Sequence, residues 1–522
     1  MKVAIGQQSL GELIAASPAK EYRRRYCYSD LANYLLQTKD PRVCTLYGLR
    51  RTGKTTLMLQ AIEDIHDYDH TLFIRADRKS EIHDLEKLMD QYPDAKYVFV
   101  DEITEMDDFQ DMSGTLADWY AARGRRIVLT GTDSLGIHFS LSSELFDRSY
   151  IIHTTYIPFC EYSELLGIHD IDTYLRYGGT LTDGKVMYNK GFADTLDYEY
   201  TNSAIADNIQ HSLEHCNGGD GEFGPLLRFY ATGTLKTFIN KVVENDTKNF
   251  IARSLNRKFK SATLGAVKTI VGHQKEEFDF ADPSLLTNPD LVKNVCEVLS
   301  IQDPVLQQAS EEEVRVVRDY LVKLDVLLPI GEHEAIFSQP GIRYSQMEKI
   351  LDEVKNDPMI RDRYTDVAQK KVWKRLQENV LGKLMENVVF IDLAKNPDIA
   401  KQYKVTNYRQ PEGKYEFDIV LIDKKERLAY LMEVKHSKEC VSESQAKHLL
   451  NPDACQKVEE KFGVRIAGKA VVYRGVSATV SDGISYLNVE NFLCNPKSYL
   501  PVMRDAYQEA MNEHGRNDEW SR

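Results

Sequence analysis

An α/β fold with several domains is predicted for this 522-residue chain by three observations. The apolar runs 43–47, 97–100 and 126–130 read as strands, and a helix-like stretch follows the first of them. A capped helix followed by two strand-like runs is indicated at about 300–345. Two more strand-like runs, 417–422 and 428–435, carry charged side chains. We therefore expect domains at 1–165, 166–375 and 376–500 and a C-terminal tail at 501–522, frayed after about Met511.

Charge and composition narrow the classes of protein. The formal net charge of −14 argues against a chain coated in nucleic acid, because phosphate binding needs a positive surface, but it leaves room for one basic face. No apolar run approaches the roughly 20 residues that span a bilayer, and the first residues do not resemble a signal peptide, so we expect a cytoplasmic protein without a membrane partner. The eight cysteines form no CxxC pair, which argues against a zinc site.

A phosphate-binding loop is the strongest motif. Residues 48–56 read Gly-Leu-Arg-Arg-Thr-Gly-Lys-Thr-Thr directly after the apolar run 43–47 and before a helix-like stretch. Gly48 and Gly53 allow the tight turn that points N–H groups at phosphate oxygens. Lys54 is expected to reach the β- and γ-phosphates, and the Thr55 hydroxyl to bind Mg²⁺. The other loop residues expected to contact nucleotide are Arg50, Arg51, Thr52 and Thr56.

A carboxylate pair follows the next buried strand. The apolar run 97–100 ends in Asp101 and Glu102, about 45 residues beyond the loop. We expect Asp101 to hold Mg²⁺, mostly through water, and Glu102 to orient and deprotonate the attacking water. The alternative is a solvated acidic strand end.

The stretch from about 23 to 180 resembles the archaeal-type and bacterial ATPases of the AAA superfamily. The matching motifs are the loop at 48–55, the Thr-Gly-Thr turn at 130–132, Arg148 before the next strand, the segment 157–162 and the segment 174–179. Two departures are Thr132-Asp133, where the family usually has Ser-Ser, and Asp147, which replaces a Gly. The resemblance implies an ATPase that binds ATP and Mg²⁺.

The resemblance also implies two further polar contacts to the γ-phosphate. A polar residue at the end of the strand between the loop strand and the acidic strand touches it in this family, and Thr130 and Thr132 are the candidates; an ordinary turn is the alternative. Arg148 would stabilise transition-state charge, in cis or from a neighbouring subunit, or would instead form a surface salt bridge.

A helix and a hairpin are predicted in the middle of the chain. Ser310–Glu313 is a capping box, and the strand-like runs 326–330 and 335–337 follow the helix it opens. This order is that of a winged helix, which the resembling ATPases also carry, and 339–344 fits their pattern after the wing. The wing contacts DNA or packs against the ATPase core; packing is favoured because Glu311–Glu313 repel phosphates.

The last region carries a second candidate site. A turn centred near residues 425 and 426 places Asp418 opposite Glu433, and Lys435 lies on the face of Glu433. The two carboxylates could bind Mg²⁺ or Mn²⁺ while Lys435 orients a water, and Glu386 could add a ligand. Residues 380–495 resemble the PD-(D/E)xK nuclease (restriction-endonuclease-like) fold, in which Gln445 matches a frequent polar position. The alternatives are an exposed strand of mixed charge, or this fold without activity.

Three functional hypotheses remain from the sequence. The first is an ATPase that couples hydrolysis to action on DNA, with a metal-dependent nuclease domain. The second is an ATP-dependent switch that holds a protein partner or another copy of itself, with an inactive nuclease-like domain. The third is a nuclease whose assembly ATP permits.

Overall fold

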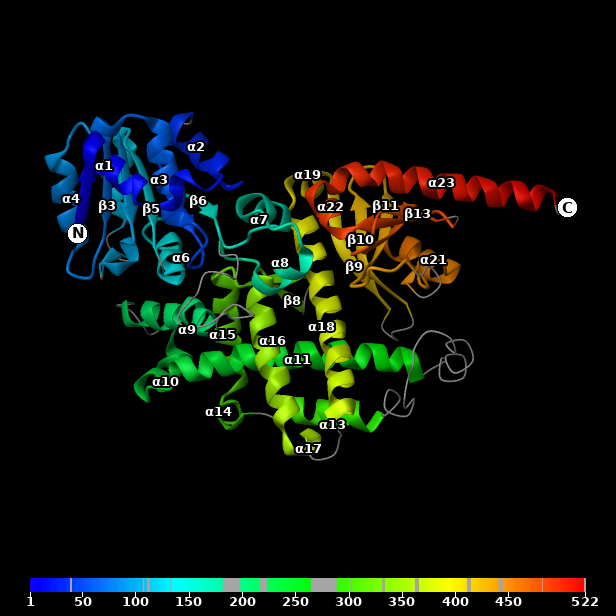
Figure 1. The fold of residues 1–522 in the computed structure, drawn as a ribbon. Helices are drawn as coiled ribbons and strands as arrows, with labels where there is room; N and C mark the ends of the chain where they lie inside the picture. Colours follow the sequence, from blue (N-terminus) through cyan, green and yellow to red (C-terminus); the bar gives the residue numbers. More distant parts are fainter. Residues whose placement is uncertain are drawn as a thin grey trace. The chain divides into compact units, whose positions relative to one another are not determined.

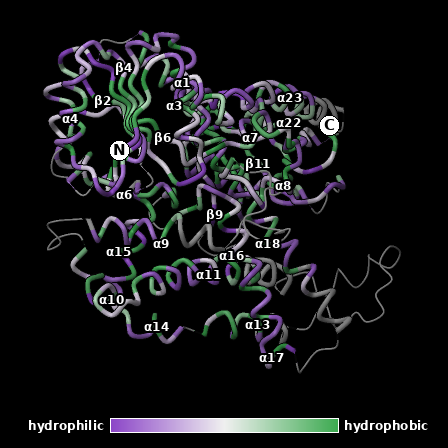
Figure 2. The backbone as a smooth tube through the Cα atoms, turned by 60° about the vertical axis from the view of Figure 1, so that its left-hand side comes forward, coloured by the Kyte–Doolittle hydropathy of each residue, from purple (hydrophilic) through white to green (hydrophobic). Residues whose placement is uncertain are grey.

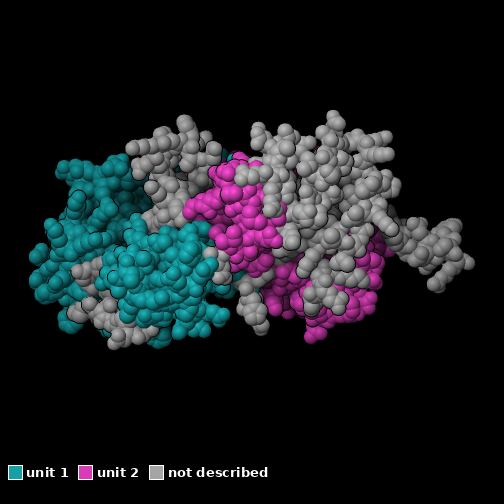
Figure 3. Space-filling model, turned by 90° about the horizontal axis from the view of Figure 1, so that it is seen from below, with its two compact units in different colours: residues 1–168, 176–245, 302–345 teal, residues 169–175, 246–301, 346–522 magenta. Residues whose placement is uncertain are grey.

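The structure, a computed structural model, describes residues 1–37, 40–106, 108–109, 113–131, 133–181, 198–215, 223–263, 289–301, 303–330, 334–361, 366–410, 415–440, 445–480 and 482–520. It divides into two compact units (Figure 3). Unit 1 comprises residues 1–168, 176–245 and 302–345, and unit 2 comprises 169–175, 246–301 and 346–522. Among the described residues, no helix combines the length and the apolar character needed to cross a bilayer.

Unit 1 is built on a six-stranded sheet with the order β1-β3-β4-β5-β2-β6 (Figure 1). The edge strand β1 is antiparallel to β3, and the other pairs are parallel. The strand β5 therefore lies between the loop strand β2 and the acidic strand β4, and their carboxyl ends meet at one edge. The bounds are β1 Lys2–Ile5, β2 Val43–Tyr47, β3 Thr71–Arg75, β4 Tyr97–Asp101, β5 Arg126–Thr130 and β6 Ser149–His153.

Helices cover both faces of this sheet. Neighbouring residues of one strand enter different hydrophobic clusters, for example Val98 and Phe99, because side chains alternate along a strand. β2 and β4 are buried on both faces and are strongly apolar (Figure 2). The cluster of Phe99 includes residues of α1 Gly6–Ala15, α2 Tyr28–Leu36 and α3 Lys54–Ile65, and that of Val98 includes α4 Ile82–Gln91 and α6 Ser134–Ser142.

A helical region completes unit 1. Its core also takes in two residues of the first region, Leu49 and Leu135, both fully buried. The predicted capping box is confirmed, since Glu313 N donates to Ser310 Oγ (3.2 Å) and Ser310 N to Glu313 Oε2 (2.7 Å). The predicted hairpin is also present, with Leu327 opposite Phe337. The elements are α9 Tyr198–His215, α10 Leu227–Ala231, α14 Pro304–Gln307, α15 Glu311–Lys323, β7 Leu327–Ile330 and β8 Glu334–Phe337. The first parts of α11 Leu235–Thr263 and α16 Pro340–Asn356 also belong to unit 1, up to residues 245 and 345.

Unit 2 contains a second six-stranded sheet with the order β13-β14-β12-β11-β10-β9. The pairs β11–β12 and β12–β14 are parallel, and the others are antiparallel. Its strands are β9 Tyr403–Arg409, β10 Glu416–Asp423, β11 Leu428–Lys435, β12 Arg465–Tyr473, β13 Ala478–Thr479 and β14 Ile484–Asn488. Its main helices are α8 Ile171–Tyr177, α13 Pro289–Ser300, α17 Pro358–Arg361, α18 Asp366–Lys395, α19 Pro397–Gln402, α21 Pro452–Phe462, α22 Val489–Cys494 and α23 Pro496–Trp520.

The expected fraying after about Met511 is not seen up to residue 520, because α23 runs over Pro496–Trp520. The buried residues Leu500, Met503 and Ala510 recur at helical spacing, so one face of α23 has a partner. A Cβ built on Gly468 in β12 would lie 3.0 Å from Met503 Cβ, which shows how closely helix and strand pack. Tertiary packing, rather than local sequence, therefore extends this helix.

Candidate functional site

The loop after β2 has a glycine-dependent backbone. Gly48 and Gly53 have φ values of 151° and 86°, which L side chains rarely adopt. A Cβ on Gly48 would lie 2.3 Å from Thr154 Oγ1, so the close approach of the following chain also excludes a side chain there. The next helix, α3, begins at Lys54. The predicted strand, loop and helix are thus in place, with the helix amino end facing the loop.

Lys54 is buried inside the loop. Its ammonium donates to the carbonyl oxygens of Gly48 (2.7 Å) and Leu49 (2.8 Å). Burial lowers the pKa of Lys54 to about 8, against the attraction of Glu102 and Asp101. Carbonyl dipoles are weaker partners for an ammonium than phosphate oxygens, so this cation is available to an anion that enters the loop.

Thr55 and Asp101 meet at the edge where β2 and β4 end. Thr55 Oγ1 donates to Asp101 Oδ1 (3.1 Å) and Oδ2 (3.2 Å), and Thr130 Oγ1 donates to Asp101 Oδ1 (3.3 Å). Burial, then the charge of Glu102, raises the pKa of Asp101. A hydroxyl beside a carboxylate is the oxygen donor set that Mg²⁺ prefers, so these residues fit the predicted metal. The other sensor candidate, Thr132, lies outside the described residues.

Glu102 leaves β4 with a left-handed backbone, at φ 57°. It lines an open cleft of about 690 Å³ that also holds most of the predicted loop residues. The cleft is lined by Arg50, Arg51, Gly53, Lys54, Thr55, Thr56, Arg75, Ala76, Asp77, Arg78, Glu102, Glu105 and Thr130. Arg75 and Arg78 were not among the predicted site residues, because the end of β3 carries no motif.

A buried ion pair supports the loop from behind. Arg25 Nε donates to Glu161 Oε1 (2.8 Å), and both side chains are almost fully buried. Arg25 Nη1 also donates to the carbonyl oxygens of Thr52 (2.8 Å) and Thr154 (2.6 Å). Thr52 Oγ1 in turn lies 2.8 Å from Thr154 Oγ1. The Thr52 side chain is thus buried and hydrogen-bonded to its protein neighbours, and the contact of this residue with nucleotide stays a prediction.

Arg148 lies at the opposite end of the sheet from the loop in this chain. This residue directly precedes β6, and its carbonyl oxygen accepts from Val43 N at the amino end of β2. The loop lies at the other end of that five-residue strand, about 16 Å away at roughly 3.3 Å per residue. Arg148 Nε pairs with Asp118 Oδ1 (2.8 Å), which is the predicted salt bridge. A role from a neighbouring subunit stays a prediction.

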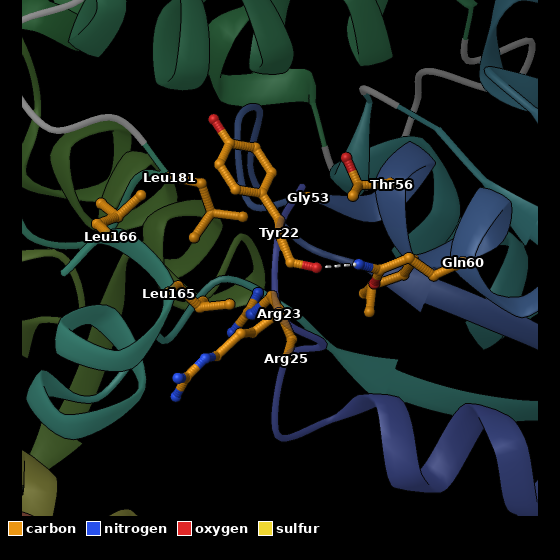
Figure 4. A pocket seen from close by; sticks show the side chains of 10 residues that line it. Tyr22, Arg23, Arg25, Gly53, Thr56, Gln60, Leu165, Leu166 and Leu181 are labelled. Atoms are coloured by element: carbon orange, nitrogen blue, oxygen red, sulfur yellow. Dashed lines mark hydrogen bonds between the residues drawn. The ribbon is translucent and has the colours of Figure 1, made fainter. Parts of the chain in front are cut away.

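A narrow pocket borders the loop on its other side (Figure 4). Tyr22 and Leu181 line it, with Gln60 Nε2 donating to the carbonyl oxygen of Tyr22 (2.9 Å). Leu181 N donates to Arg51 O (3.0 Å), and a Cβ on Gly53 would lie 2.7 Å from Leu181 Cδ1. The segment after α8 therefore covers the loop directly.

The turn after β5 is tied to α9. Asp133 caps α6 by accepting from Gly136 N (2.8 Å), and it also accepts from His211 Nδ1 (2.9 Å) and from Ser212 Oγ. Burial lowers the pKa of His211, but Asp133 outweighs it, so the pKa lies above the ordinary value. The candidate sensor turn thus has a direct polar link to the helical region.

The segments 174–179 and 339–344, both noted as motifs in the sequence, contact each other next to the β7–β8 hairpin. Gln339 Nε2 donates to Gly179 O (2.6 Å) and to Thr155 O (3.3 Å), while Gly341 N donates to Gly178 O (3.1 Å). Thr155 Oγ1 accepts from Leu49 N in the loop (3.1 Å). Gln339, the second residue after β8, is therefore linked through Thr155 to Leu49 in the phosphate-binding loop.

The second candidate site lies in unit 2 with the predicted register. Ile419 pairs with Met432, so Asp418 and Glu433 are the next opposite residues. Lys435 Nζ lies 2.6 Å from Glu433 Oε2 and 3.9 Å from Asp418 Oδ2, and Val434 N donates to Asp418 Oδ2 (2.9 Å). The buried Glu433 Oε1 accepts no hydrogen bond in the described structure. The three predicted side chains are thus together.

The carboxylates of this site influence one another. Burial raises the pKa of Glu433 to about 8; Lys435 opposes this, and Asp418 and Glu386 add to it. Glu386 on α18 also has a raised pKa, from burial and Asp418, and it pairs with Lys383. Gln445 Nε2 donates to Glu439 O (2.7 Å). No group of three His, Cys, Asp or Glu side chains that could hold a metal ion occurs among the described residues, and Glu386 as a third ligand stays a prediction.

Comparison with known proteins identifies one region. Residues 40–163 match a family model described as an AAA domain. That stretch includes the loop, β4 and β5, so the chain contains an AAA-family ATPase domain with the P-loop α/β fold. The match covers less than half of the 522 residues. No curated protein matches the chain.

Three solved structures show distant similarity. The RuvB Holliday junction branch migration motor of Thermotoga maritima is 14% identical with a TM-score of 0.21, over 40% of this chain and 69% of that one. AMPPCP-bound DnaA from Aquifex aeolicus is 12% identical with a TM-score of 0.24, over 69% and 96%. The Aeropyrum pernix ORC1 protein in complex with DNA is 12% identical with a TM-score of 0.24, over 66% and 95%. Values this low carry no conclusion about activity.

Proposed function

We propose that this chain binds ATP with Mg²⁺ at the loop after β2 and hydrolyses it. The observation that carries the proposal is the contact of Thr55 Oγ1 with both carboxylate oxygens of Asp101, beside the buried cation of Lys54. The hydroxyl and the carboxylate suit a metal ion, and the ammonium at the amino end of α3 suits the negative charge of a triphosphate. The AAA domain match over the same residues supports it.

Each polar residue of the loop region has a separate role in the proposed hydrolysis. Lys54 exchanges the carbonyl oxygens of Gly48 and Leu49 for β- and γ-phosphate oxygens. Thr55 and, through water, Asp101 would hold magnesium, which would neutralise phosphate charge when bound. Glu102 takes a proton from a water whose oxygen bonds to the γ-phosphorus, while the bond from that phosphorus to the bridging oxygen breaks and ADP leaves.

The phosphate-binding loop contacts the helical region in two ways, so hydrolysis at the loop can change the conformation of that region. Leu49 is fully buried among residues of α9, α11 and α15, and its N–H donates to Thr155, which contacts Gln339. We propose that this link couples nucleotide state to α15 and the β7–β8 hairpin, a winged-helix arrangement that would bind DNA. The alternative is a switch that binds a protein partner, which the acidic helix start at Glu311–Glu313 favours.

We also propose that unit 2 has the PD-(D/E)xK fold and that Asp418, Glu433 and Lys435 form a metal-dependent nuclease site. The unpartnered Glu433 Oε1 supports a ligand there. The alternative is an inactive domain, favoured by the ion pair of Lys435 with Glu433, which occupies one of the two carboxylate oxygens a cation needs.

One experiment tests the whole proposal. ATP turnover is measured for the wild type and for Lys54→Ala, with and without duplex or single-stranded DNA, and the exposed Lys87→Ala variant controls for contaminating activity. Loss of turnover in Lys54→Ala alone supports the ATPase; equal turnover in all three proteins rejects it. Stimulation by DNA supports DNA coupling, and indifference to DNA supports the protein-binding switch.

The nuclease proposal has its own assay. Labelled DNA is incubated with Mg²⁺ or Mn²⁺ and wild type, Glu433→Ala or the exposed-pair variant Glu416→Ala. Cleavage lost only in Glu433→Ala supports the site. Cleavage that survives Glu433→Ala, or that never occurs, supports the inactive alternative.

A further inference from the structure

The nucleotide cleft contains more cationic side chains than the sequence motifs assign. Besides Lys54, four arginines line it: Arg50, Arg51, Arg75 and Arg78. Arg78 is held by Glu105, with 2.8 Å between Nε and Oε2. Arg75, in contrast, makes no side-chain hydrogen bond or ion pair with any residue that the structure describes, and its side chain is exposed at the cleft.

The position of Arg75 is fixed by strand pairing. It is the last residue of β3, and its Cα partner in the parallel strand β4 is Asp101. Paired residues on neighbouring strands point to the same face, so Arg75 projects on the side of Asp101. Ala76 N donates to Asp101 O (2.9 Å), so the pairing continues past Arg75 and its backbone is not frayed.

Strand pairing places the backbone of Arg75 about 4.8 Å from the backbone of Asp101. The carboxylate of Asp101 accepts from Thr55 and Thr130. Arg75 is close enough to act electrostatically on Asp101 but is not paired with it. Arg75 therefore lines the same cleft as Glu102 and pairs along the strands with Asp101, while its guanidinium forms no ion pair with either carboxylate.

We propose that Arg75 is the in-cis arginine that stabilises the γ-phosphoryl oxygens in the transition state of ATP hydrolysis. This inference rests on the proposed ATPase function. Negative charge spreads over the three equatorial oxygens as the bond to ADP breaks, and a planar guanidinium matches two of them at once. Arg148 cannot serve in the same subunit because it lies at the amino end of the sheet. Arg75 makes the site independent of a neighbouring subunit for this charge.

The test separates transition-state binding from ground-state binding. The kcat, the KM for ATP and the affinities for ADP and for ADP with aluminium fluoride are measured for the wild type, Arg75→Ala and Arg75→Lys. We expect Arg75→Ala to lower kcat about 100-fold or more, with ADP affinity changed less than threefold and fluoride-complex affinity lost in proportion to kcat. Added guanidinium should restore part of the rate of Arg75→Ala.

The matched control is Arg42→Ala, since Arg42 precedes β2 at the opposite end of the sheet and pairs with Asp40. If the wild type hydrolyses ATP and Arg75→Ala has the same kcat, the inference about Arg75 is overturned, while the proposed ATPase function is retained. Equal losses of ADP and fluoride-complex affinity also overturn it, because Arg75 would then serve binding alone. A wild type that neither binds nor hydrolyses ATP overturns the proposed function and this inference together.

Discussion

Arg25 and Glu161 form a buried ion pair that fixes the back of the phosphate-binding loop, with 2.8 Å between Nε and Oε1. Arg25 also donates to the carbonyl oxygens of Thr52 and Thr154, so one guanidinium joins the loop to the chain after β6. Tyr26 N donates to the same Glu161 oxygen (2.9 Å). The donors of this charge are thus satisfied by several partners, which is the condition for burying it.

Neutralising one partner of this pair should lower the free energy of unfolding of unit 1. We expect Glu161→Gln to destabilise unit 1 by about 3–5 kcal/mol, because Arg25 would keep a buried charge without its counterion. Replacing both residues with apolar ones of similar volume should cost less than either single change. The measurement is chemical unfolding, followed by hydrogen exchange of α3 amides.

A surface pair provides the matched control. Arg24 pairs with Asp64, and both side chains are substantially exposed. Asp64→Asn should change stability by less than about 1 kcal/mol. If Glu161→Gln cost no more than Asp64→Asn, the buried pair would not be a structural anchor.

Gly179 should be far less tolerant of a side chain than Gly167. Both have left-handed backbones, with φ of 105° and 67°. A Cβ on Gly179 would lie 2.3 Å from Gln339 Cβ, whereas a Cβ on Gly167 meets nothing within 4 Å. Gly167→Ala should cost about 1 kcal/mol from backbone strain alone. Gly179→Ala should cost clearly more, measured by thermal unfolding, and should weaken any response of ATP turnover to DNA; equal costs would contradict the packing described behind the hairpin.

The sequence predicted those parts of the site whose residues lie close together in the chain, within one strand and the turn that follows it. The loop, Asp101 and Thr130 each end a buried strand, and parallel strands bring their carboxyl ends to one edge. The pairing of Asp418 with Glu433 followed from a short turn that fixes register. Local pattern suffices in these cases because strand period and turn length leave few alternatives.

The parts that the sequence could not supply depend on three-dimensional neighbours. Arg25 and Glu161 are 136 residues apart, and neither position has a local pattern that pairs it with the other. Arg148 precedes β6, and only the parallel pairing of β6 with β2 places it at the edge of the sheet opposite the loop. The pairing of Lys383 with Glu386 follows helical spacing, but its effect on a metal site depends on how α18 meets β11.

The link between the turn after β5 and α9 should be sensitive to pH. Burial lowers the pKa of His211, while Asp133 and Glu105 raise it and Arg78 lowers it, and the net direction is upward from 6.5. A raised pKa means that protonated His211 stabilises the folded state fully below pH 6.5, and that this stability is lost as pH rises through the folded value. Thermal midpoints from pH 5.5 to 8.5 should fall more steeply for wild type than for His211→Gln.

The control for that titration is His83→Gln, since His83 is exposed on α4 and 3.5 Å from Glu86. It should leave the slope of the wild type unchanged. Parallel curves for wild type and His211→Gln would show that the ion pair with Asp133 contributes nothing to folding.

Glu433 should make unit 2 less stable as pH rises, and the sign follows from its pKa of about 8, raised by burial from 4.5. Between these values the folded state holds a proton that the unfolded state has lost, so stability falls by up to about 1.4 kcal/mol per pH unit. Glu433→Gln should remove this slope and exceed the wild type in stability at pH 8, measured by hydrogen exchange of β10 and β11. A buried carboxylate with a strongly raised pKa lowers folding stability, and such groups are found most often at binding and catalytic sites.

Added Mn²⁺ distinguishes a binding site from mere strain in unit 2. A cation that binds Glu433 must displace its proton, so Mn²⁺ should protect β10 and β11 in the wild type, and more strongly at pH 8 than at pH 6.5. Glu433→Gln should show no protection, while Glu416→Gln, which alters an exposed pair with Arg409 on the same sheet, should behave like the wild type. Protection that is equal in all three proteins would place the cation elsewhere and leave Asp418, Glu433 and Lys435 as a structural ion cluster.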